Sequence, residues 1–247
     1  MLQRPHRPAA VLFDMDGLLV DTEPLWFMAE STVMARMGVQ WEPADQSALI
    51  GGPMSRAVTY MIDRAGGGYD AAEVARSLKS EMASLLVAGP IAWMPGAREL
   101  VVSLRQAGIP RALVSSSGRD LVNHVLAVVL AEVGDDAFDL SVAGDEVERT
   151  KPHPAPYLEA ASRLGVSARH CVVLEDSRTG VTSGLAAGCH VVAVSHATSG
   201  SPPIVAAELG PELVEAARER LTTATSLHDL TVEVLAALVG GDGRQDV

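Results

Sequence analysis

Five short apolar runs occur along the chain, and polar residues follow each of them. Uninterrupted apolar runs of this length are typical of strands buried on both faces, as in a parallel sheet. The later runs are separated by segments of helical periodicity that end at a glycine, a common helix stop. This alternation predicts parallel pairing with right-handed crossovers. The runs are AVLF (10–13), RALV (111–114), LSVA (140–143), CVVL (171–174) and HVVAV (190–194).

The interval between the first run and the second has a different pattern. From Asp21 to Met94 no segment resembles a strand, and three or four amphipathic helical segments occur instead. Thr22 stands where it could cap the first helix, and Asp70 with Glu73 three residues later resembles a capping box. A helical domain inserted here would lie over the carboxyl ends of the strands, where open α/β sheets bind ligands.

The whole pattern predicts an α/β fold, namely a doubly wound, Rossmann-like parallel sheet core with an inserted all-helical cap domain. The expected core spans residues 1–22 and 95–247, and the expected cap spans 23–94. Nearer the C-terminus, 198–221 indicates an excursion interrupted by proline and glycine and followed by a helix. A final amphipathic helix is expected over 226–240.

Composition and charge narrow the classes of function. Hydrophobic residues make up 48% of the 247 positions, enough to bury a large core. The formal net charge of −12 argues against nucleic-acid binding, which needs a positive field, but allows a small anionic substrate beside a cation. We find no signal peptide and no stretch long enough to span a membrane, so a cytoplasmic protein is expected. Cys171 and Cys189 fit neither a CxxC pair nor a zinc cluster and are expected to be core thiols of a reduced compartment.

Four of the five runs end on residues with carboxylate, hydroxyl or ammonium groups. In a parallel sheet the carboxyl ends of neighbouring strands share one edge, so these side chains are expected to converge on one crevice. The residues are Asp14 and Asp16 after the first run, Ser115, Ser116 and Ser117 after the second, Lys151 after the third, and Glu175 and Asp176 after the fourth.

Four carboxylates in one crevice repel each other, and burial adds a desolvation cost, so the arrangement requires a cation. Oxygen ligands favour a hard ion, and Mg²⁺ commonly bridges carboxylates to a substrate phosphate. The serine turn precedes a helix start, which offers hydroxyl and N–H groups to an anion. Lys151 supplies a compact positive charge, and it is one of only two lysines among 19 basic residues, the other being Lys79.

These residues resemble a known family. The segments DMDGLLVDTE, the Ser115 turn, KPHP and VVLEDSRTG match the four motifs of the haloacid dehalogenase superfamily in their usual order. The resemblance covers about residues 8–197, and the helical insertion resembles the helical cap of that superfamily. The segment DTEPLW is most similar to the branch of sugar-phosphate phosphatases and β-phosphoglucomutase-like enzymes.

The resemblance implies a role for each acid. Asp14 would be the nucleophile that attacks phosphorus and forms an aspartyl phosphate. Asp16 would protonate the leaving alkoxide and then activate water. Mg²⁺ would be held by Asp14, by the main-chain carbonyl of Asp16 and by Asp176, with Glu175 as a direct or supporting ligand.

The same resemblance implies the groups that bind the phosphoryl group and the substrate. Ser115 and Lys151 would contact the transferring phosphoryl group, with Ser116 in the same turn, and Thr22 is either a substrate contact or a helix cap. The expected protein is a monomeric or weakly dimeric Mg²⁺-dependent phosphatase. Its substrate would be a small phosphorylated metabolite such as a sugar or polyol phosphate.

The main alternative is a phosphomutase of the β-phosphoglucomutase type. Those enzymes carry a histidine five positions after the aspartate of the DT pair, whereas Trp26 stands there in this chain. Their cap arginine has no counterpart in register, since Arg56 is displaced, and both departures favour hydrolysis. Trp26 is read either as a core residue or as a residue that faces the crevice, and Arg56 as a solvated side chain of a helix.

Other classes fit the sequence less well. Haloacid dehalogenases lack the second aspartate, and phosphonatases replace it with alanine and use a lysine of the cap, whereas Asp16 is present and Lys79 is the only lysine of the expected cap. A binding or regulatory module without catalysis would predict a lost nucleophile or metal ligand, and none is missing.

Overall fold

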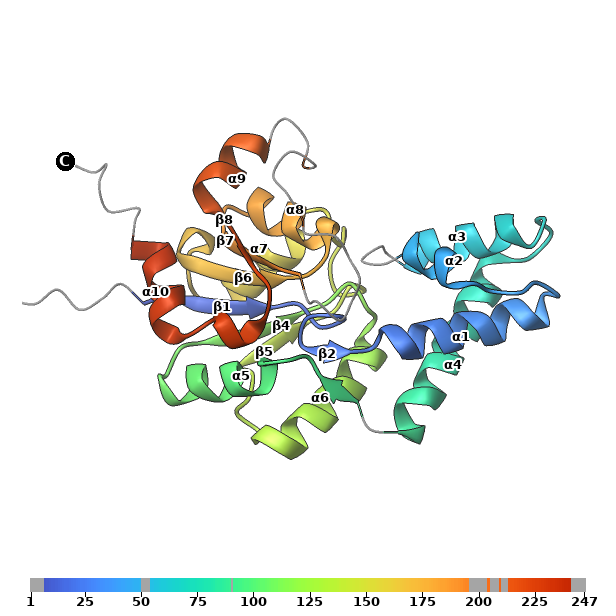
Figure 1. The fold of residues 1–247 in the computed structure, drawn as a ribbon, viewed down its shortest axis with the longest axis horizontal. Coiled ribbons are helices and arrows are strands. Elements are labelled where there is room, and N and C mark those ends of the chain that lie inside the picture. Colours follow the sequence, from blue (N-terminus) through green and yellow to red (C-terminus); the bar gives the residue numbers. More distant parts are fainter. Residues whose placement is uncertain are drawn as a thin grey trace, which may run out of the picture.

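The computed structural model describes residues 7–49, 54–89, 91–195, 204, 209 and 213–240. Its centre is a six-stranded sheet in the order β5-β4-β1-β6-β7-β8, with every pairing parallel (Figure 1). All five predicted apolar runs are strands of this sheet. The strands are β1 (Ala10–Phe13), β4 (Arg111–Val114), β5 (Leu140–Val142), β6 (Cys171–Glu175), β7 (His190–Val194) and β8 (Leu221–Ala224).

Helices cover both faces of the sheet, which explains why the central strands are mostly apolar on both faces. In β1, Val11 and Phe13 join the hydrophobic cluster on one face, and Ala10 and Leu12 join the cluster on the other. The first cluster includes α5 (Ala97–Gln106), α6 (Arg119–Val133) and α10 (Val232–Gly240), and the second includes α7 (Ala155–Arg163) and α8 (Arg178–Ala186). The predicted doubly wound α/β core is therefore confirmed. No helix in the described part of the chain is long and apolar enough to cross a membrane.

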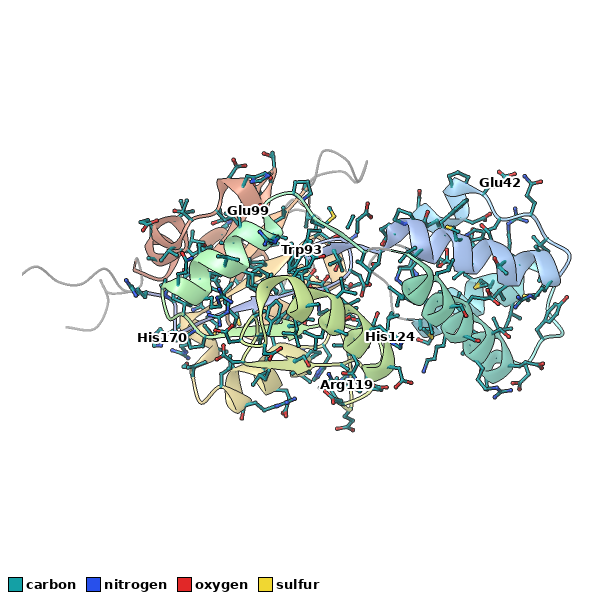
Figure 2. The ribbon with its side chains drawn as sticks, turned by 90° about the horizontal axis from the view of Figure 1, so that it is seen from below. Glu42, Trp93, Glu99, Arg119, His124 and His170 are labelled. Carbon is teal, nitrogen blue, oxygen red and sulfur yellow. The ribbon has the colours of Figure 1, made fainter. Side chains whose placement is uncertain are left out.

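Four helices form a separate lobe beyond the carboxyl end of β1 (Figure 1). They are α1 (Glu23–Arg36), α2 (Pro43–Ser47), α3 (Met54–Arg64) and α4 (Ala71–Ala88). The lobe has its own hydrophobic cluster, which contains Met34, Trp41, Met61 and Leu78. Viewed from below, the lobe lies to one side of the core, with α6 on the side of the core nearest to it (Figure 2). The inserted helical cap is thus confirmed.

The expected helix caps of the lobe have different outcomes. Asp70 caps α4 as predicted, since its side chain accepts a hydrogen bond of 2.9 Å from the backbone N–H of Glu73. Thr22 stands at the N-cap position of α1, but its side chain makes no capping bond, so that expectation is wrong. The Thr22 hydroxyl donates to Asp16 instead, at 2.7 Å.

Two short strands contradict the expectation that no strand lies between residues 21 and 94. β2 (Val20–Asp21) and β3 (Ala92–Trp93) form an antiparallel ribbon where the chain enters and leaves the lobe. Two residues are too few to show an alternating pattern in the sequence. Trp93, labelled in Figure 2, ties the ribbon to the core because its indole N–H donates to Glu132 of α6 at 2.7 Å.

The sixth strand, β8, was also missed by the sequence prediction. It is paired on one side only, and its middle residues Thr222 and Thr223 are exposed, so its sequence has no buried run. It follows α9 (Val214–Arg220), which lies at the end of the expected excursion 198–221. Most of that excursion, like the tail after 240, lies outside the described residues. Of the final helix expected over 226–240, α10 and a short 3-10 turn, Leu227–Asp229, are present.

Candidate active site

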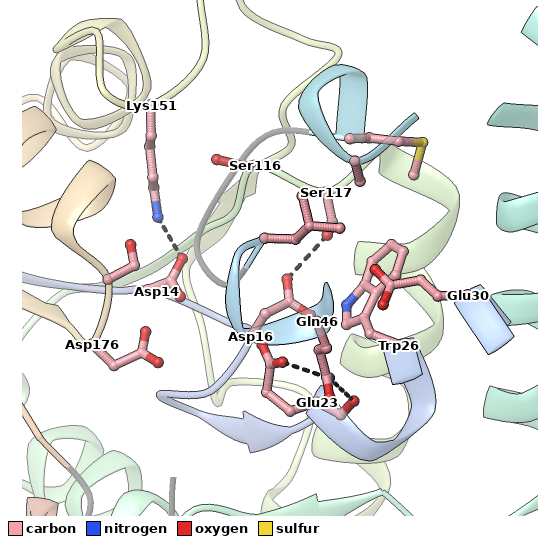
Figure 3. Close-up of a pocket in the computed structure, with 14 residues that line it drawn as sticks. Asp14, Asp16, Glu23, Trp26, Glu30, Gln46, Ser116, Ser117, Lys151 and Asp176 are labelled. Carbon is pink, nitrogen blue, oxygen red and sulfur yellow. Dashed lines mark hydrogen bonds and ion pairs between the residues drawn. The ribbon is translucent and has the colours of Figure 1, made fainter. Parts of the chain in front are cut away.

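The central strands bring the predicted residues to one edge of the sheet. Asp14 continues β1, and its N–H donates to the carbonyl of Leu174 in β6 at 3.0 Å. Ser115 continues β4 in the same way, with a bond of 3.0 Å to the carbonyl of Val142. A cavity of about 100 Å³ opens at this edge, between the sheet and the helical lobe (Figure 3). Its core side is lined by Asp14, Asp16, Ser116, Ser117, Lys151, Asp176 and Ser177.

Three acids form a cluster that can hold a metal ion. Asp14, Glu175 and Asp176 each offer a carboxylate oxygen, and these oxygens all lie within 4.8 Å of one another. Gly17 makes room for the cluster: its backbone has φ +80°, and a Cβ there would lie 2.3 Å from Oδ2 of Asp176. Oδ1 of Asp176 is buried and has no hydrogen-bond partner among the described residues.

The ionisation of these acids supports the same conclusion. Burial and the neighbouring charge of Glu175 raise the pKa of Asp14 to about 8, although Lys151 acts in the opposite direction. Burial and the charge of Asp14 raise the pKa of Asp176 well above its usual range. Even with Lys151 beside them, the carboxylates therefore cannot all be ionised at neutral pH unless a further cation joins them. Oxygen donors and an unpartnered buried oxygen fit a hard divalent cation such as Mg²⁺.

Lys151 is the cation of the cluster, and it is almost fully buried. Its Nζ donates to Asp14, to Oε1 of Glu175 at 2.7 Å and to the carbonyl of Val114 at 2.9 Å. Burial alone would lower the pKa of Lys151, but the charges of Asp14 and Glu175 outweigh it and raise the pKa above the usual value. Lys151 therefore carries its proton at any physiological pH.

Glu175 is fully buried, and both of its oxygens accept hydrogen bonds. Oε1 accepts from Lys151 and, at 2.6 Å, from the hydroxyl of Tyr157. Oε2 accepts from the N–H of Ser177 at 3.2 Å and from its hydroxyl at 3.0 Å. Tyr157 was not predicted as a site residue, and its ring also lies 5.0 Å from Nζ of Lys151. Glu175 thus connects the lysine to the loop that carries Asp176.

Asp16 has different surroundings from Asp14, although only one residue separates them. Its Oδ1 accepts from Thr22 at 2.7 Å, and its Oδ2 accepts from the hydroxyls of Ser115 at 3.2 Å and Ser117 at 3.0 Å. In Figure 3 its carboxylate lies on the lobe side of the cavity, away from Asp176. The two aspartates of the DxD motif therefore occupy separate places, one in the acid cluster and one in a set of hydroxyl donors.

The serine turn differs in detail from what the motif suggested. Ser115 is fully buried, donates to Asp16, accepts from the N–H of Ser117 at 2.9 Å and is not among the residues that line the cavity. Ser116 does line the cavity, as does Ser117. The hydroxyl of Ser116 accepts from Thr150 at 3.2 Å. Thr22 also lies outside the lining, beneath Asp16.

The lobe supplies the opposite wall of the cavity. Glu23, Trp26 and Glu30 of α1 face it, together with Gln46 of α2 (Figure 3). Trp26 therefore lines the cavity, and it is also partly buried against the hydrophobic cluster of the lobe. Burial and the charges of Asp16 and Asp21 raise the pKa of Glu23 to about 7.

Glu30 is the second acid of this wall, and burial raises its pKa to about 7 although Trp41 donates to it at 3.1 Å. Neither Glu23 nor Glu30 was predicted as a site residue. Their spacing of seven residues on one helix, with Trp26 between them, was the available signal, because residues so spaced share a face.

Two other residues weighed in the sequence lie away from the acids. Arg56 is exposed, donates to the carbonyl of Ala48 at 2.8 Å and is not among the lining residues. Lys79 lines a neighbouring cavity of about 250 Å³ between α4 and α6, together with His124 and Asp145. Lys79 therefore does not line the cavity that contains the acids, where a phosphonatase would need a lysine of the lobe.

Comparisons with known proteins show the family of this chain. The model of the family described as haloacid dehalogenase-like hydrolase matches residues 11–194. Hexitol phosphatase A of Escherichia coli (strain K12) is 37% identical over 186 residues, which cover 74% of this chain and 82% of that protein. Fructose-1-phosphate phosphatase YqaB of the same strain is 31% identical over 190 residues, covering 76% and 97%.

Among solved structures, CbbY from Rhodobacter sphaeroides in complex with phosphate superimposes with a TM-score of 0.75. The match covers 90% of this chain and 96% of that one at 24% identity, so it shows a shared fold. With the family match over most of its length and the phosphatases that resemble it, this chain belongs to the haloacid dehalogenase-like hydrolase family.

Proposed function

We propose that this phosphatase hydrolyses the phosphate monoester of a small polyhydroxy compound, a sugar or polyol phosphate, through an aspartyl phosphate on Asp14. The observation that carries the proposal is the division between the two aspartates. Asp14 lies against Lys151 and Asp176, and Asp16 lies among hydroxyl donors on the side of the lobe. The substrate class is supported by the names of the similar enzymes, a hexitol phosphatase and a fructose-1-phosphate phosphatase.

The reaction follows from these positions in two steps. The carboxylate of Asp14 attacks phosphorus, so a P–O bond to Asp14 forms while the P–O bond to the substrate alcohol breaks. Asp16 gives its proton to the departing oxygen. Asp16 then takes a proton from a water molecule that attacks phosphorus, which releases phosphate and restores Asp14. The positive charge of Lys151 offsets the repulsion between the nucleophile and the phosphoryl group.

Supporting roles are assigned on the same basis. Asp14, Asp176 and the main-chain carbonyl of Asp16 would hold Mg²⁺, which supplies positive charge beside the phosphoryl oxygens. Glu175 is proposed to orient Lys151, because each of its oxygens already accepts two hydrogen bonds.

The hydroxyl groups divide into two sets. Ser116 lines the cavity and is proposed to contact the phosphoryl group together with Lys151. Ser115 and Thr22 are proposed to orient Asp16, to which both donate a hydrogen bond. The family motif implies that Ser115 also contacts the phosphoryl group, and this role stays a prediction.

The position of Trp26 favours hydrolysis over the phosphomutase alternative. Trp26 faces the cavity at the place where the sequence comparison expects a histidine in mutases. An indole can donate a hydrogen bond but cannot accept a proton from a sugar hydroxyl. With β-glucose 1-phosphate as substrate, free phosphate is the expected product. Glucose 6-phosphate formed without release of phosphate would reverse this choice.

The test of the proposed function is a Mg²⁺-supplemented screen for phosphate release. The panel contains hexitol 6-phosphates, fructose 1-phosphate, nucleotides and 2-phosphoglycolate. Release is expected with the polyol and sugar esters, and Asp14→Asn should abolish it while circular dichroism stays unchanged. Equal release by the Asp14→Asn protein would exclude the proposed nucleophile.

A further inference from the structure

The wall of the cavity that faces the phosphoryl site presents two carboxyl groups, an amide, the indole of Trp26 and apolar groups, and no cationic side chain among the described residues. Glu23 and Glu30 lie seven residues apart on α1, with Gln46 of α2 beside them (Figure 3). The remaining lining residues of the lobe are Trp26 and the apolar Leu49, Met54 and Ala57. A leaving group bound beyond Asp16 would have to meet this wall, because it forms the side of the cavity opposite the sheet.

The hydrogen bonds of Gln46 decide what its amide can offer. Its Nε2 donates to the main-chain carbonyl of Glu23 at 2.7 Å and to the Glu23 carboxylate at 3.0 Å. Both amide protons are therefore used, and only the carbonyl oxygen remains for a ligand. Glu30 accepts one bond from Trp41 and retains acceptor capacity on its carboxylate.

The wall contains no group that would balance a second negative charge. Among the described residues that line the cavity, Lys151 is the only cation, and it is bound to Asp14 and Glu175. The stretch 50–53, which follows Leu49 and lies outside the described residues, is Ile-Gly-Gly-Pro and carries no charged side chain. A distal carboxylate or phosphate would meet two acids and no counter-charge among the described residues of the wall.

We propose that Glu23, Glu30 and Gln46 select substrates with a neutral polyhydroxy leaving group and reject those with a second anionic group. Hydroxyls can donate to the three acceptors, whereas a distal anion finds no cation in the described wall to pair with and is repelled by the ionised acids. This inference rests on the proposed function for the position of the phosphoryl group. It excludes bisphosphates, phosphorylated sugar acids and phosphoglycolate as good substrates.

A matched pair of ligands tests the inference without depending on turnover. Glucitol 6-phosphate and 6-phosphogluconate share one carbon skeleton and differ at C1, which is a hydroxymethyl group in one and a carboxylate in the other. Isothermal titration calorimetry at pH 8, above the pKa of about 7 of both Glu23 and Glu30, measures the binding of both ligands to the Asp14→Asn protein with Mg²⁺ in excess. The glucitol ester should bind at least about tenfold more tightly, since like charges at close range disfavour the wrong ligand. Equal binding, or tighter binding of 6-phosphogluconate, would overturn the proposal.

Variants locate the effect on the wall. In the Asp14→Asn background, Glu23→Gln combined with Glu30→Gln should narrow the ratio of the two dissociation constants by at least about threefold. The matched control is Asp63→Asn, which removes one negative charge from an exposed position of α3 outside the cavity and should leave the ratio unchanged. A ratio that narrows equally in the control, or not at all in the double variant, would show that the wall does not discriminate.

The same pair of ligands separates this inference from the proposed function. If the protein with Asp14 intact releases no phosphate from glucitol 6-phosphate while the binding ratio is as expected, the proposed hydrolysis fails and the selectivity of the wall stands. If phosphate is released equally from both esters, hydrolysis stands and the selectivity fails.

Discussion

Tyr157→Phe tests the hydrogen-bond network that holds Lys151 beside Asp14. The Tyr157 side chain is fully buried, and its hydroxyl donates to Oε1 of Glu175, which is itself fully buried, at 2.6 Å. Phenylalanine keeps the ring and its contact with Lys151 but removes the donor. Because Glu175 is then left with one donor fewer in a site that excludes water, the loss is larger than for an exposed bond.

The magnitude follows from the type of bond that is lost. A hydrogen bond to a charged group contributes about 1.5–3 kcal/mol, and no cavity forms because only an oxygen atom is removed. We expect Tyr157→Phe to lower the free energy of unfolding by about 2 kcal/mol. Since Glu175 orients Lys151, kcat for a phosphate ester should also fall.

Urea denaturation followed by circular dichroism measures the change, with the slope against urea expected to stay constant. Tyr69→Phe is the matched control, since the Tyr69 hydroxyl is exposed and donates to the carbonyl of Met37 at 3.1 Å. That control should cost less than about 0.5 kcal/mol. Equal small losses in the two variants would refute the idea that Tyr157 supports a buried charge.

Three further predictions test other parts of the site. Glu30 has a pKa raised from 4.5 to about 7 by burial, so the folded chain keeps a proton that the unfolded chain releases, and stability should fall as pH rises through this range. Glu30→Gln should reduce this pH-dependent loss of stability and raise the free energy of unfolding at pH 8 by about 2 kcal/mol, measured by thermal or urea unfolding. An unchanged dependence of stability on pH would contradict the prediction. Gly17→Ala places a Cβ 2.3 Å from Oδ2 of Asp176 at a backbone φ of +80°. The affinity for Mg²⁺, measured by calorimetry, should therefore fall at least about tenfold. An affinity equal to that of the wild-type protein would show that Mg²⁺ does not bind at this acid cluster. Thr22→Val removes the 2.7 Å bond to Asp16, and kcat should fall by about tenfold with little change in KM; a rise in KM alone would assign Thr22 to substrate binding.

The sequence predicted the sheet well because burial on both faces leaves a simple pattern. Each of the five runs is a strand of the sheet, and the convergence of Asp14, Ser115 and Glu175 follows from parallel pairing alone. β8 has exposed threonines at the edge of the sheet, and the ribbon of β2 and β3 has two residues per strand. Neither has an apolar run that could be recognised.

The details of the site depended on side-chain directions that no motif specifies. The motif pointed to Ser115, but the fold buries its hydroxyl against Asp16 and brings Ser116 to the cavity. Tyr157 contacts Glu175 of β6 only because α7 packs across β5, β4 and β1 on the same face of the sheet. The acids of the lobe were missed because the orientation of α1 over the sheet edge is set by packing between distant segments.

The most direct test of the central claim is to identify the residue that carries the phosphoryl group during turnover. Protein quenched in acid while it hydrolyses a ³²P-labelled hexitol phosphate with Mg²⁺ is digested and mapped by mass spectrometry and radioactivity. We expect label on the peptide that contains Asp14, and no label and no turnover in Asp14→Asn. Label on another residue, or continued turnover in Asp14→Asn, would contradict the account.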